Sequence, residues 1–439
     1  MKKILFLLLL SLLVISSCSN NETCIIKNDV LDYYRKNYKD TFINKSTYDQ
    51  ESLDRYIETL SDEEKIGQLF LISLDGNNIE QLSHIMNTNE IAPGGYLLFA
   101  FNIADTAEEM IDFLSELQCQ YLENELIPPF ISIDHEGGVV NRLRNICSKL
   151  PSQLNVAERF SITEATRLYE LQGEQLYNLG IHVNIAPVVE VLTDENIQFL
   201  DDRSFGNIDN VLKYSEAQIK GMTKTGVLPV LKHFPGNTNN DPHTGLPVLK
   251  CDLKTFEDVY LTPFYELKDD YEPGILVAHT VVPEIDEKPA CLSEKIISLL
   301  DYQNKSYNGL IFSDDLLMKA LIKNGYPVEK SLIGAIKAGI NILMISTGSF
   351  DQYADIVLQE YHTDPDFKKK VDDSVKKILE WKISCNLLQR DVVQNGFFTY
   401  EASVSSITKE NPDMIENRKK AFHEAYDEAS ALYNEVWWK

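Results

Sequence analysis

The sequence predicts an α/β fold: one TIM-type (β/α)8 barrel domain with an N-terminal tether and a C-terminal helical tail. Three observations predict it: eight short apolar runs typical of buried strands, amphipathic helical stretches between these runs, and polar residues where several runs end. A doubly wound open sheet is the alternative. Such sheets often carry a glycine-rich phosphate-binding turn after the first strand, and no such turn follows the first apolar run of this chain.

The first residues are typical of an export signal. Two lysines precede the apolar run 4–15, which is too short to span a bilayer, and small residues lead from this run to Cys18. The tetrapeptide ISSC that ends at Cys18 resembles the lipobox that is cleaved before a lipid-modified cysteine. We therefore predict a lipoprotein signal peptide over residues 1–17 and lipidation of Cys18. The protein is then exported and lipid-anchored in the cell envelope, in the periplasm or at the outer membrane or cell surface. An ordinary cleaved signal peptide is the alternative.

Composition limits the expected partners. The chain has 41 basic and 67 acidic residues, for a net charge of −26. This balance argues against a nucleic-acid partner, because phosphate binding needs a basic face. We expect a monomer that contacts the membrane only through its lipid anchor. The seven cysteines include no C-x-x-C pair and no cysteine–histidine spacing suited to zinc, so we expect no metal and no cofactor, and leave the disulfide pairing open.

The predicted elements follow in order after the signal peptide. Residues 18–58 are polar and tyrosine-rich and predict a lipid-anchored tether and a leading helix. The segment LSDEEKIGQL, residues 60–69, has a serine followed by acids, which is a helix-start signal. The barrel domain is expected over residues 59–386. Its predicted strand runs are 67–73, 95–99, 130–134, 181–188, 228–234, 274–279, 309–314 and 341–346.

The stretches between the strand runs predict helices. Apolar residues recur there at three- and four-residue spacing, most clearly over 106–122 and 164–180. Residues 387–439 predict a C-terminal extension that is mostly helical. One face of its last helix carries Phe422, Ala425, Tyr426, Ala429, Tyr433 and Val436. We expect this face to dock on the barrel, and contact with a partner or the cell wall through Trp437 and Trp438 is the alternative.

Polar residues follow several of the predicted strands. Asp134 ends the third run, Lys232 and His233 end the fifth, His279 ends the sixth and Asp314 the seventh. The carboxyl ends of barrel strands lie on one rim, where enzymes with this fold place their active sites. For any single residue, a strand that simply enters solvent is the alternative interpretation. Four such ends on one rim predict a polar site.

Six blocks of sequence carry these and other polar residues in a fixed order. They are IDHEGGVVNRLR (133–144), HVNIAPVVEV (182–191), DDRSFG (201–206), KHFP (232–235), VAHTVVPEIDEKPACLS (277–293) and IFSDDLLM (311–318). Together they closely resemble family 3 glycoside hydrolases of the β-N-acetylglucosaminidase, or β-hexosaminidase, branch. The resemblance covers about residues 60 to 385. It implies that the barrel is a catalytic domain that removes terminal β-linked N-acetylglucosamine from glycans or peptidoglycan fragments.

The resemblance also implies the catalytic residues of a retaining, exo-acting reaction. Asp314 matches the nucleophile, which must be ionised to attack the anomeric carbon, and the neighbouring Asp315 is the alternative. Asp241 and His243 match a dyad that replaces the usual second carboxylic acid. A histidine that titrates near neutral pH, oriented by a carboxylate, can give and later accept a proton. For Ser313-Asp314-Asp315 taken alone, a helix N-cap after a strand is the alternative interpretation.

Five further residues match positions at which the family holds the hydroxyl groups of the sugar. A pocket for a terminal sugar ring needs charged side chains with several donors or acceptors around one cavity. The alternative for each residue is a salt bridge or a surface charge. The five are Asp134, Arg142, Arg203, Lys232 and His233.

The chain departs from the family pattern at three places. The family loop usually reads KHFPGHG before its aspartate and histidine, whereas here Gly236 runs into NTNNDPH, about two residues short. Glu190 stands where the pattern APVxDV has aspartate, and Phe101 replaces a usual arginine in LFARN. We expect these changes to reshape the edge of the pocket. The alternatives for function are a β-glucosidase, an N-acetylglucosaminide phosphorylase that uses phosphate as acceptor, and a glycan-binding lipoprotein without turnover.

Overall fold

A computed structural model describes most of the chain. The described residues are 50–268, 271–301, 306–385, 387–392, 398–402 and 412–438. The chain divides into two units, Met1–Phe42 and Ile43–Lys439, and all described residues belong to the second. The expected signal peptide, Cys18 and the tether up to residue 49 lie outside them. Within the described ranges, no helix combines the length and the apolar character that crossing a membrane requires.

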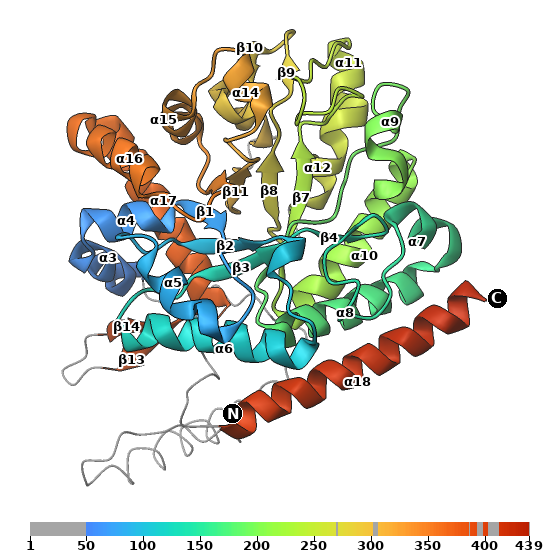
Figure 1. Ribbon diagram of the computed structural model, residues 1–439. Helices are drawn as coiled ribbons and strands as arrows, with labels where there is room; N and C mark the ends of the chain where they lie inside the picture. The colour runs from blue at the N-terminus through green and yellow to red at the C-terminus, as the bar shows by residue number, and fades with distance from the viewer. Residues whose placement is uncertain are drawn as a thin grey trace, which may run out of the picture. The chain divides into compact units, whose positions relative to one another are not determined.

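Eight parallel strands form the centre of the fold (Figure 1). They are β1 (Phe70–Ser73), β2 (Gly95–Leu98), β3 (Phe130–Ile133), β6 (Val183–Asn184), β7 (Leu228–Phe234), β8 (Gly274–Val277), β11 (Ile311–Ser313) and β12 (Leu343–Ile345). They pair in the order β11-β8-β7-β6-β3-β2-β1-β12. A parallel bridge between Phe312 and Ile342 joins the two ends of the sheet. The predicted eight-stranded barrel is confirmed.

Seven of the eight strands are shorter than the apolar runs that predicted them, and the sequence explains two of these differences. Gly67 and Gln68 of the first run belong to helix α4 (Asp62–Gln68), because Ser61 and Glu64 form a capping box that starts the helix just before the run. The fourth run pairs as a strand only at Val183–Asn184. It contains Pro187, which has no N–H to give to the ladder.

Helices cover the outside of the barrel. The two clearest helix predictions are confirmed by α6 (Ala107–Glu123) and α8 (Ile162–Leu179). The longer helices among the rest of the described shell are α3 (Gln50–Thr59), α7 (Gln153–Arg159), α10 (Ile208–Thr225), α15 (Val328–Ala338), α16 (Asp351–Thr363) and α17 (Pro365–Ser384). Shorter helices in the same shell are α5 (Leu82–Asn87), α12 (Thr262–Leu267) and α14 (Lys319–Lys323).

The core has two layers that follow from the alternation of side chains along each strand. Leu71, Leu97 and Phe130 belong to a cluster contributed by all eight strands or the residues beside them, which fills the barrel interior. Phe70 and Ile72, the neighbours of Leu71, belong instead to the cluster between strands and helices. Because the interior is packed, the open side-chain positions lie at the ends of the strands. The rim at the carboxyl ends is therefore the place for a site.

The C-terminal extension contains a hairpin and a long helix. Strands β13 (Leu388–Val392) and β14 (Phe398–Ala402) pair antiparallel, which the sequence pattern does not indicate. Helix α18 (Pro412–Trp437) lies along α8 (Figure 1). Its expected face is buried at Phe422, Ala425, Ala429 and Val436, whereas Tyr426 is exposed. The expected docking of the helix on the barrel is confirmed.

Candidate functional site

A buried ion network lies at the carboxyl ends of β3 and β7. Lys232 Nζ lies 2.6 Å from Asp134 Oδ1 and 2.6 Å from Glu136 Oε1. Arg203, in the loop after β6, donates from Nε to Glu136 Oε2 at 2.8 Å and from Nη2 to Glu136 Oε1 at 3.0 Å. The side chains of Lys232 and Glu136 are only 4% and 1% exposed. Glu136, which was not predicted, thus joins Lys232 to Arg203, and Asp134 is joined to them through Lys232.

The network keeps its members charged. Burial opposes ionisation of Glu136, but the charges of Lys232 and Arg203 outweigh burial and lower its pKa to about 2. Burial alone would lower the pKa of Lys232, and the carboxylates of Asp134 and Glu136 raise it instead. At neutral pH the site therefore contains fixed charges of both signs.

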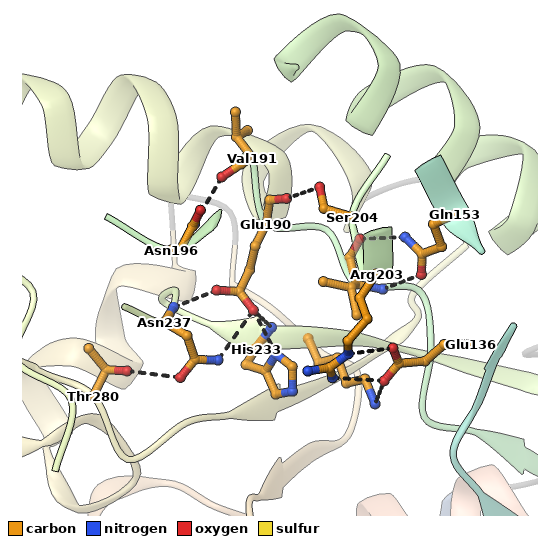
Figure 2. A network of polar contacts seen from close by, with 12 residues as sticks. Glu136, Gln153, Glu190, Val191, Asn196, Arg203, Ser204, His233, Asn237 and Thr280 are labelled. Atoms are coloured by element: carbon orange, nitrogen blue, oxygen red, sulfur yellow. Dashed lines mark hydrogen bonds and ion pairs between the residues drawn. The ribbon is translucent and has the colours of Figure 1, made fainter. Parts of the chain in front are cut away.

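A second network surrounds His233 (Figure 2). Glu190, which is buried, accepts a hydrogen bond from His233 Nδ1 at 2.6 Å through Oε1. Its Oε2 accepts from the backbone N–H of Asn237 at 2.5 Å. Asn237 Nδ2 donates to Glu190 Oε1 at 3.3 Å, and Thr280 Oγ1 donates to Asn237 Oδ1 at 3.4 Å. Glu190 is therefore a structural centre of the site, not a residue at the edge of the pocket as expected.

Asp314 directly follows β11 on the same rim. Its backbone N–H donates to Val277 O at 3.0 Å, and its Oδ1 accepts from the backbone N–H of Asp315 at 2.8 Å. Burial would raise the pKa of Asp314, but the nearby charges of His279, His233 and Lys232, together with the Asp315 N–H, lower it. This carboxylate is held ionised, which a nucleophile requires.

Asp315 has a different environment. Its Oδ2 accepts from Ser346 Oγ at 2.6 Å, and its Oδ1 accepts from the backbone N–H groups of Ser346 at 3.1 Å and Leu317 at 3.0 Å. Burial, with a smaller contribution from Asp314, raises its pKa. His279 lies 3.0 Å from Asp315 O through Nε2. Asp315 and His279 thus brace the rim beside Asp314.

The predicted dyad forms. His243 Nδ1 lies 2.7 Å from Asp241 Oδ1, and the backbone N–H of His243 donates to the same oxygen at 2.9 Å. Burial opposes ionisation of Asp241, but these hydrogen bonds and the charge of His243 together outweigh burial and lower its pKa. The side chain of His243 is 69% exposed and that of Asp241 is 47% exposed. Unlike the networks around Lys232 and Glu190, the dyad lies in an exposed part of the loop after β7.

The loop that carries the dyad is fixed at both ends. The backbone N–H of Asn239 donates to Glu195 O at 2.6 Å, and its side chain donates to Asp194 O at 2.8 Å. At the far end, the N–H of Val281 donates to Pro247 O at 2.9 Å. Between these points, residues 240–246 form the tip.

Arg142 and Phe101 complete the predicted positions. Arg142 follows β5 (Val140–Asn141) and is partly buried, and its Nε has no hydrogen-bond partner within the described chain. Phe101 is exposed and stacks on Phe99, with ring centroids 5.7 Å apart. Phe99 packs against the barrel interior at the end of β2. The departure at Phe101 therefore places an exposed aromatic ring on the rim.

The sequence contained a weak signal for the two residues that were not predicted. Glu136 is the second residue after Asp134 in the same block, and alternate residues of an extended segment share a side. Asn237 lies in the loop where the chain departs from the family pattern. Their roles depend on Arg203 and Glu190, which are distant in sequence, so local patterns do not reveal them.

The fold and this rim of paired cations and carboxylates define an α/β-barrel protein with a polar site suited to a polyol ligand. The chain matches the family model described as the glycosyl hydrolase family 3 N-terminal domain over residues 61–381. It belongs to this family.

Relatives in the family carry related names. Beta-hexosaminidase A of Pseudoalteromonas piscicida is 30% identical over 331 residues, which cover 69% of this chain and 55% of that protein. Beta-hexosaminidase LpqI of Mycobacterium tuberculosis is 32% identical over 266 residues, which cover 58% of this chain and 68% of that protein. The chain thus spans about half the length of the first relative and about two thirds of the second.

Solved structures agree with the fold. The structure of LpqI from M. tuberculosis is 27% identical with a TM-score of 0.66, covering 74% of this chain and 94% of that one. A family 3 β-N-acetylglucosaminidase from Paenibacillus is 26% identical with a TM-score of 0.69, covering 83% of this chain and 69% of that one.

Proposed function

We propose that this chain is a retaining, exo-acting β-N-acetylglucosaminidase that hydrolyses terminal β-linked N-acetylglucosamine from glycans or peptidoglycan fragments. The observation that carries the proposal is Asp314, a carboxylate with a lowered pKa on the same barrel rim as the Lys232–Glu136–Arg203 network. The names of the family relatives support the substrate class.

The proposed reaction has two steps. Asp314 attacks the anomeric carbon while the bond to the leaving oxygen breaks, and His243 gives its proton to that oxygen. His243 then takes a proton from water as the water oxygen attacks the same carbon and releases Asp314. Asp241, 2.7 Å from His243, orients the imidazole through both steps. Because His243 is exposed, we propose that the loop tip, residues 240–246, bends over the bound sugar.

Charge balance in the pocket supports an uncharged sugar as ligand. Each cation of the network already faces a carboxylate: Lys232 faces Asp134 and Glu136, and Arg203 faces Glu136. Such paired side chains still offer donors and acceptors to hydroxyl groups. They offer little net attraction to an anion, which favours water over phosphate as the acceptor.

Chromogenic substrates test the proposal. Wild-type protein should release 4-nitrophenol from the β-N-acetylglucosaminide and leave the β-glucoside nearly untouched, and Asp314→Asn should abolish release. Asp209→Asn, an exposed aspartate at the start of α10, is the control and should behave as wild type. Better cleavage of the glucoside would replace the proposal with a β-glucosidase. Sugar binding without turnover, unchanged in Asp314→Asn, would indicate a binding lipoprotein.

The product identifies the acceptor. With phosphate in the buffer, hydrolysis yields free N-acetylglucosamine, whereas a phosphorylase yields the sugar 1-phosphate. Product analysis with and without phosphate therefore separates these two alternatives on the same protein. We expect free N-acetylglucosamine in both buffers.

We also propose that the protein is exported and anchored through lipid on Cys18. The support is the sequence of the first 18 residues, with two lysines, an apolar run and the ISSC tetrapeptide. Metabolic labelling with a radioactive fatty acid should label wild type and not Cys18→Ala. Wild-type protein that is released unlabelled into the medium would indicate an ordinary signal peptide.

A further inference from the structure

One buried carboxylate contacts two parts of the site at once. Glu190 lies between His233 and Asn237 (Figure 2) and accepts from His233 Nδ1 at 2.6 Å and from the Asn237 backbone N–H at 2.5 Å. His233 belongs to the proposed sugar-binding group. Asn237 lies at the start of the loop that carries Asp241 and His243. A single side chain therefore joins the ring that contacts the sugar to the base of the loop that carries the proton donor.

The geometry determines where His233 carries its hydrogen. Both oxygens of Glu190 accept from backbone N–H groups, Oε1 from His233 at 3.3 Å and Oε2 from Asn237 at 2.5 Å, so we assign Nδ1 of His233 as the donor in the 2.6 Å contact. Its Nε2 is then left for the sugar, as an acceptor when the ring is neutral. Without this contact, nothing in the hydrogen bonds of His233 within the described chain would select this tautomer.

The same carboxylate fixes the base of the loop. Besides its bond to Glu190, Asn237 accepts from Thr280, and Asn239 is bound to the backbone of Asp194 and Glu195. These contacts fasten the first turn of the loop to the segment after β6. Glu190 therefore helps to fix the position at which the loop tip, residues 240–246, begins.

Two departures from the family pattern meet in this contact. Glu190 is longer by one methylene group than the aspartate of the pattern, and it reaches Asn237 at the beginning of the shortened loop. The shortened loop still presents Asp241 and His243 as a formed pair.

We propose that Glu190 is a positioning residue with two separate effects. It holds His233 in the Nδ1–H tautomer for the sugar, and it sets the base of the shortened loop so that His243 meets the leaving oxygen. The inference rests on the proposed function, in which His233 binds the sugar and His243 donates the proton. Glu190 acts through these two residues.

Two substitutions of Glu190 separate the two effects. In Glu190→Gln, the amide has one oxygen and one NH2 group, so the oxygen can accept from only one of two backbone N–H groups, that of Asn237 at 2.5 Å or that of His233 at 3.3 Å, and the shorter contact takes it. The NH2 group then faces His233 Nδ1, which must become an acceptor and move its hydrogen to Nε2. In Glu190→Asp, the carboxylate is too short to hold both partners, so the base of the loop is no longer fixed relative to His233.

Two substrates with different leaving groups report on the loop. The 2,4-dinitrophenyl β-N-acetylglucosaminide departs without a proton, whereas the phenyl glycoside needs one. Glu190→Asp should lower kcat/KM for the phenyl glycoside at least about tenfold more than for the dinitrophenyl glycoside, since only the former uses His243. Glu190→Gln should lower kcat/KM for both by the same factor, mainly through KM, because both share the sugar.

Nitrogen-15 NMR of the histidines reads the tautomer without relying on catalysis. The signal of His233, assigned by its absence in His233→Gln, should show hydrogen on Nδ1 in wild type and on Nε2 in Glu190→Gln. The control is Glu195→Gln, whose exposed side chain lies in the same segment and whose backbone carbonyl contacts the loop. Glu195→Gln should match wild type both in kcat/KM for the two glycosides and in the tautomer of His233.

The outcomes keep this inference separate from the proposed function. An equal loss for both substrates in Glu190→Asp, or an unchanged tautomer in Glu190→Gln, would overturn the positioning role. If Glu190→Asp does not fold, the tautomer measurement on Glu190→Gln decides the question alone. The two ideas can also fail separately. If wild type cleaves neither glycoside, but His233 carries its hydrogen on Nδ1 in wild type and on Nε2 in Glu190→Gln, the proposed function is contradicted and the effect of Glu190 on His233 is established.

Discussion

The ammonium group of Lys232 lies 2.6 Å from a carboxylate oxygen of Glu136, and both side chains are almost completely buried. The same carboxylate also binds Arg203 through two hydrogen bonds. If the charge of Glu136 is removed, Lys232 and Arg203 share one carboxylate, that of Asp134, instead of two. A buried charge that loses its partner is strongly destabilising, so Glu136 connects the stability of the fold to the shape of the site.

Glu136→Gln should lower the free energy of unfolding at pH 7 by about 3 to 5 kcal/mol. The pKa of Glu136 falls from 4.5 to about 2 in the fold, so its carboxylate contributes fully above the unfolded value and loses its contribution as the pH falls towards 2. The difference between wild type and variant should therefore shrink on acidification. Urea unfolding at several pH values measures it.

A surface carboxylate provides the control for this prediction. Asp373 is paired with Lys369 on α17, and both side chains are exposed. Asp373→Asn should cost less than about 1 kcal/mol. Equal losses in the two variants would contradict the special role of the buried network.

Adjacent aspartates should respond differently to the same substitution. Asp315→Asn keeps Oδ1 as the acceptor for the backbone N–H groups of Ser346 and Leu317, and its new NH2 group can donate to Ser346 Oγ. We expect the variant to stay folded and to keep a measurable part of its activity. Asp314→Asn should lose turnover by at least about 10⁴-fold, measured with the β-N-acetylglucosaminide. Complete loss in Asp315→Asn with full activity in Asp314→Asn would reverse the assignment.

His243→Ala should remove the proton donor and leave the nucleophile. We expect kcat/KM for a phenyl glycoside to fall by about 10² to 10⁴-fold, with a much smaller fall for the dinitrophenyl glycoside. Azide should restore turnover of the dinitrophenyl glycoside by His243→Ala and give a glycosyl azide as product. Azide is already an anion, so it attacks the sugar–enzyme intermediate without a general base.

The chain offers a matched histidine as control. His362 is exposed and lies 2.9 Å from Asp62, so it forms a second histidine–aspartate pair away from the strand ends. His362→Ala should leave both substrates and the azide reaction unchanged. If it lowered activity as much as His243→Ala, the assigned proton donor would be wrong.

Two neighbours on α18 test the docking of this helix. Phe422 is buried against the barrel shell, whereas His423 is exposed and paired with Glu108. Phe422→Ala should lower the free energy of unfolding by about 3 kcal/mol or more, and His423→Ala by less than about 1 kcal/mol. Urea unfolding followed by tryptophan fluorescence gives both values. Similar small losses would mean that the helix does not pack in solution as the structure shows.

The fold could be predicted from the sequence because each element carries a local signal. Every one of the eight strands lies within an apolar run, and the Ser61 capping box starts α4 where the sequence indicates a helix. The ends of the strands differ from the ends of the apolar runs. Gly67 and Gln68 are helical because a capping signal just before them outweighs the apolar pattern.

The site could be predicted only in part. Asp134 and Asp314 directly follow β3 and β11, and Lys232 and His233 are among the last three residues of β7, so their common rim follows from the barrel itself. The function of Glu136 as a shared partner depends on Arg203, which is 67 residues away. Pairings of this kind arise when distant segments pack together, and no local spacing encodes them.

The position of α18 has a consequence for biosynthesis. The last long helix of the chain packs on α8, where Ala425 and Ala429 cover Leu171. Until α18 has been synthesised and has folded, that patch of α8 stays exposed, although all eight barrel strands precede α18 in the sequence. Protection of this surface must therefore wait for α18, or come from a chaperone.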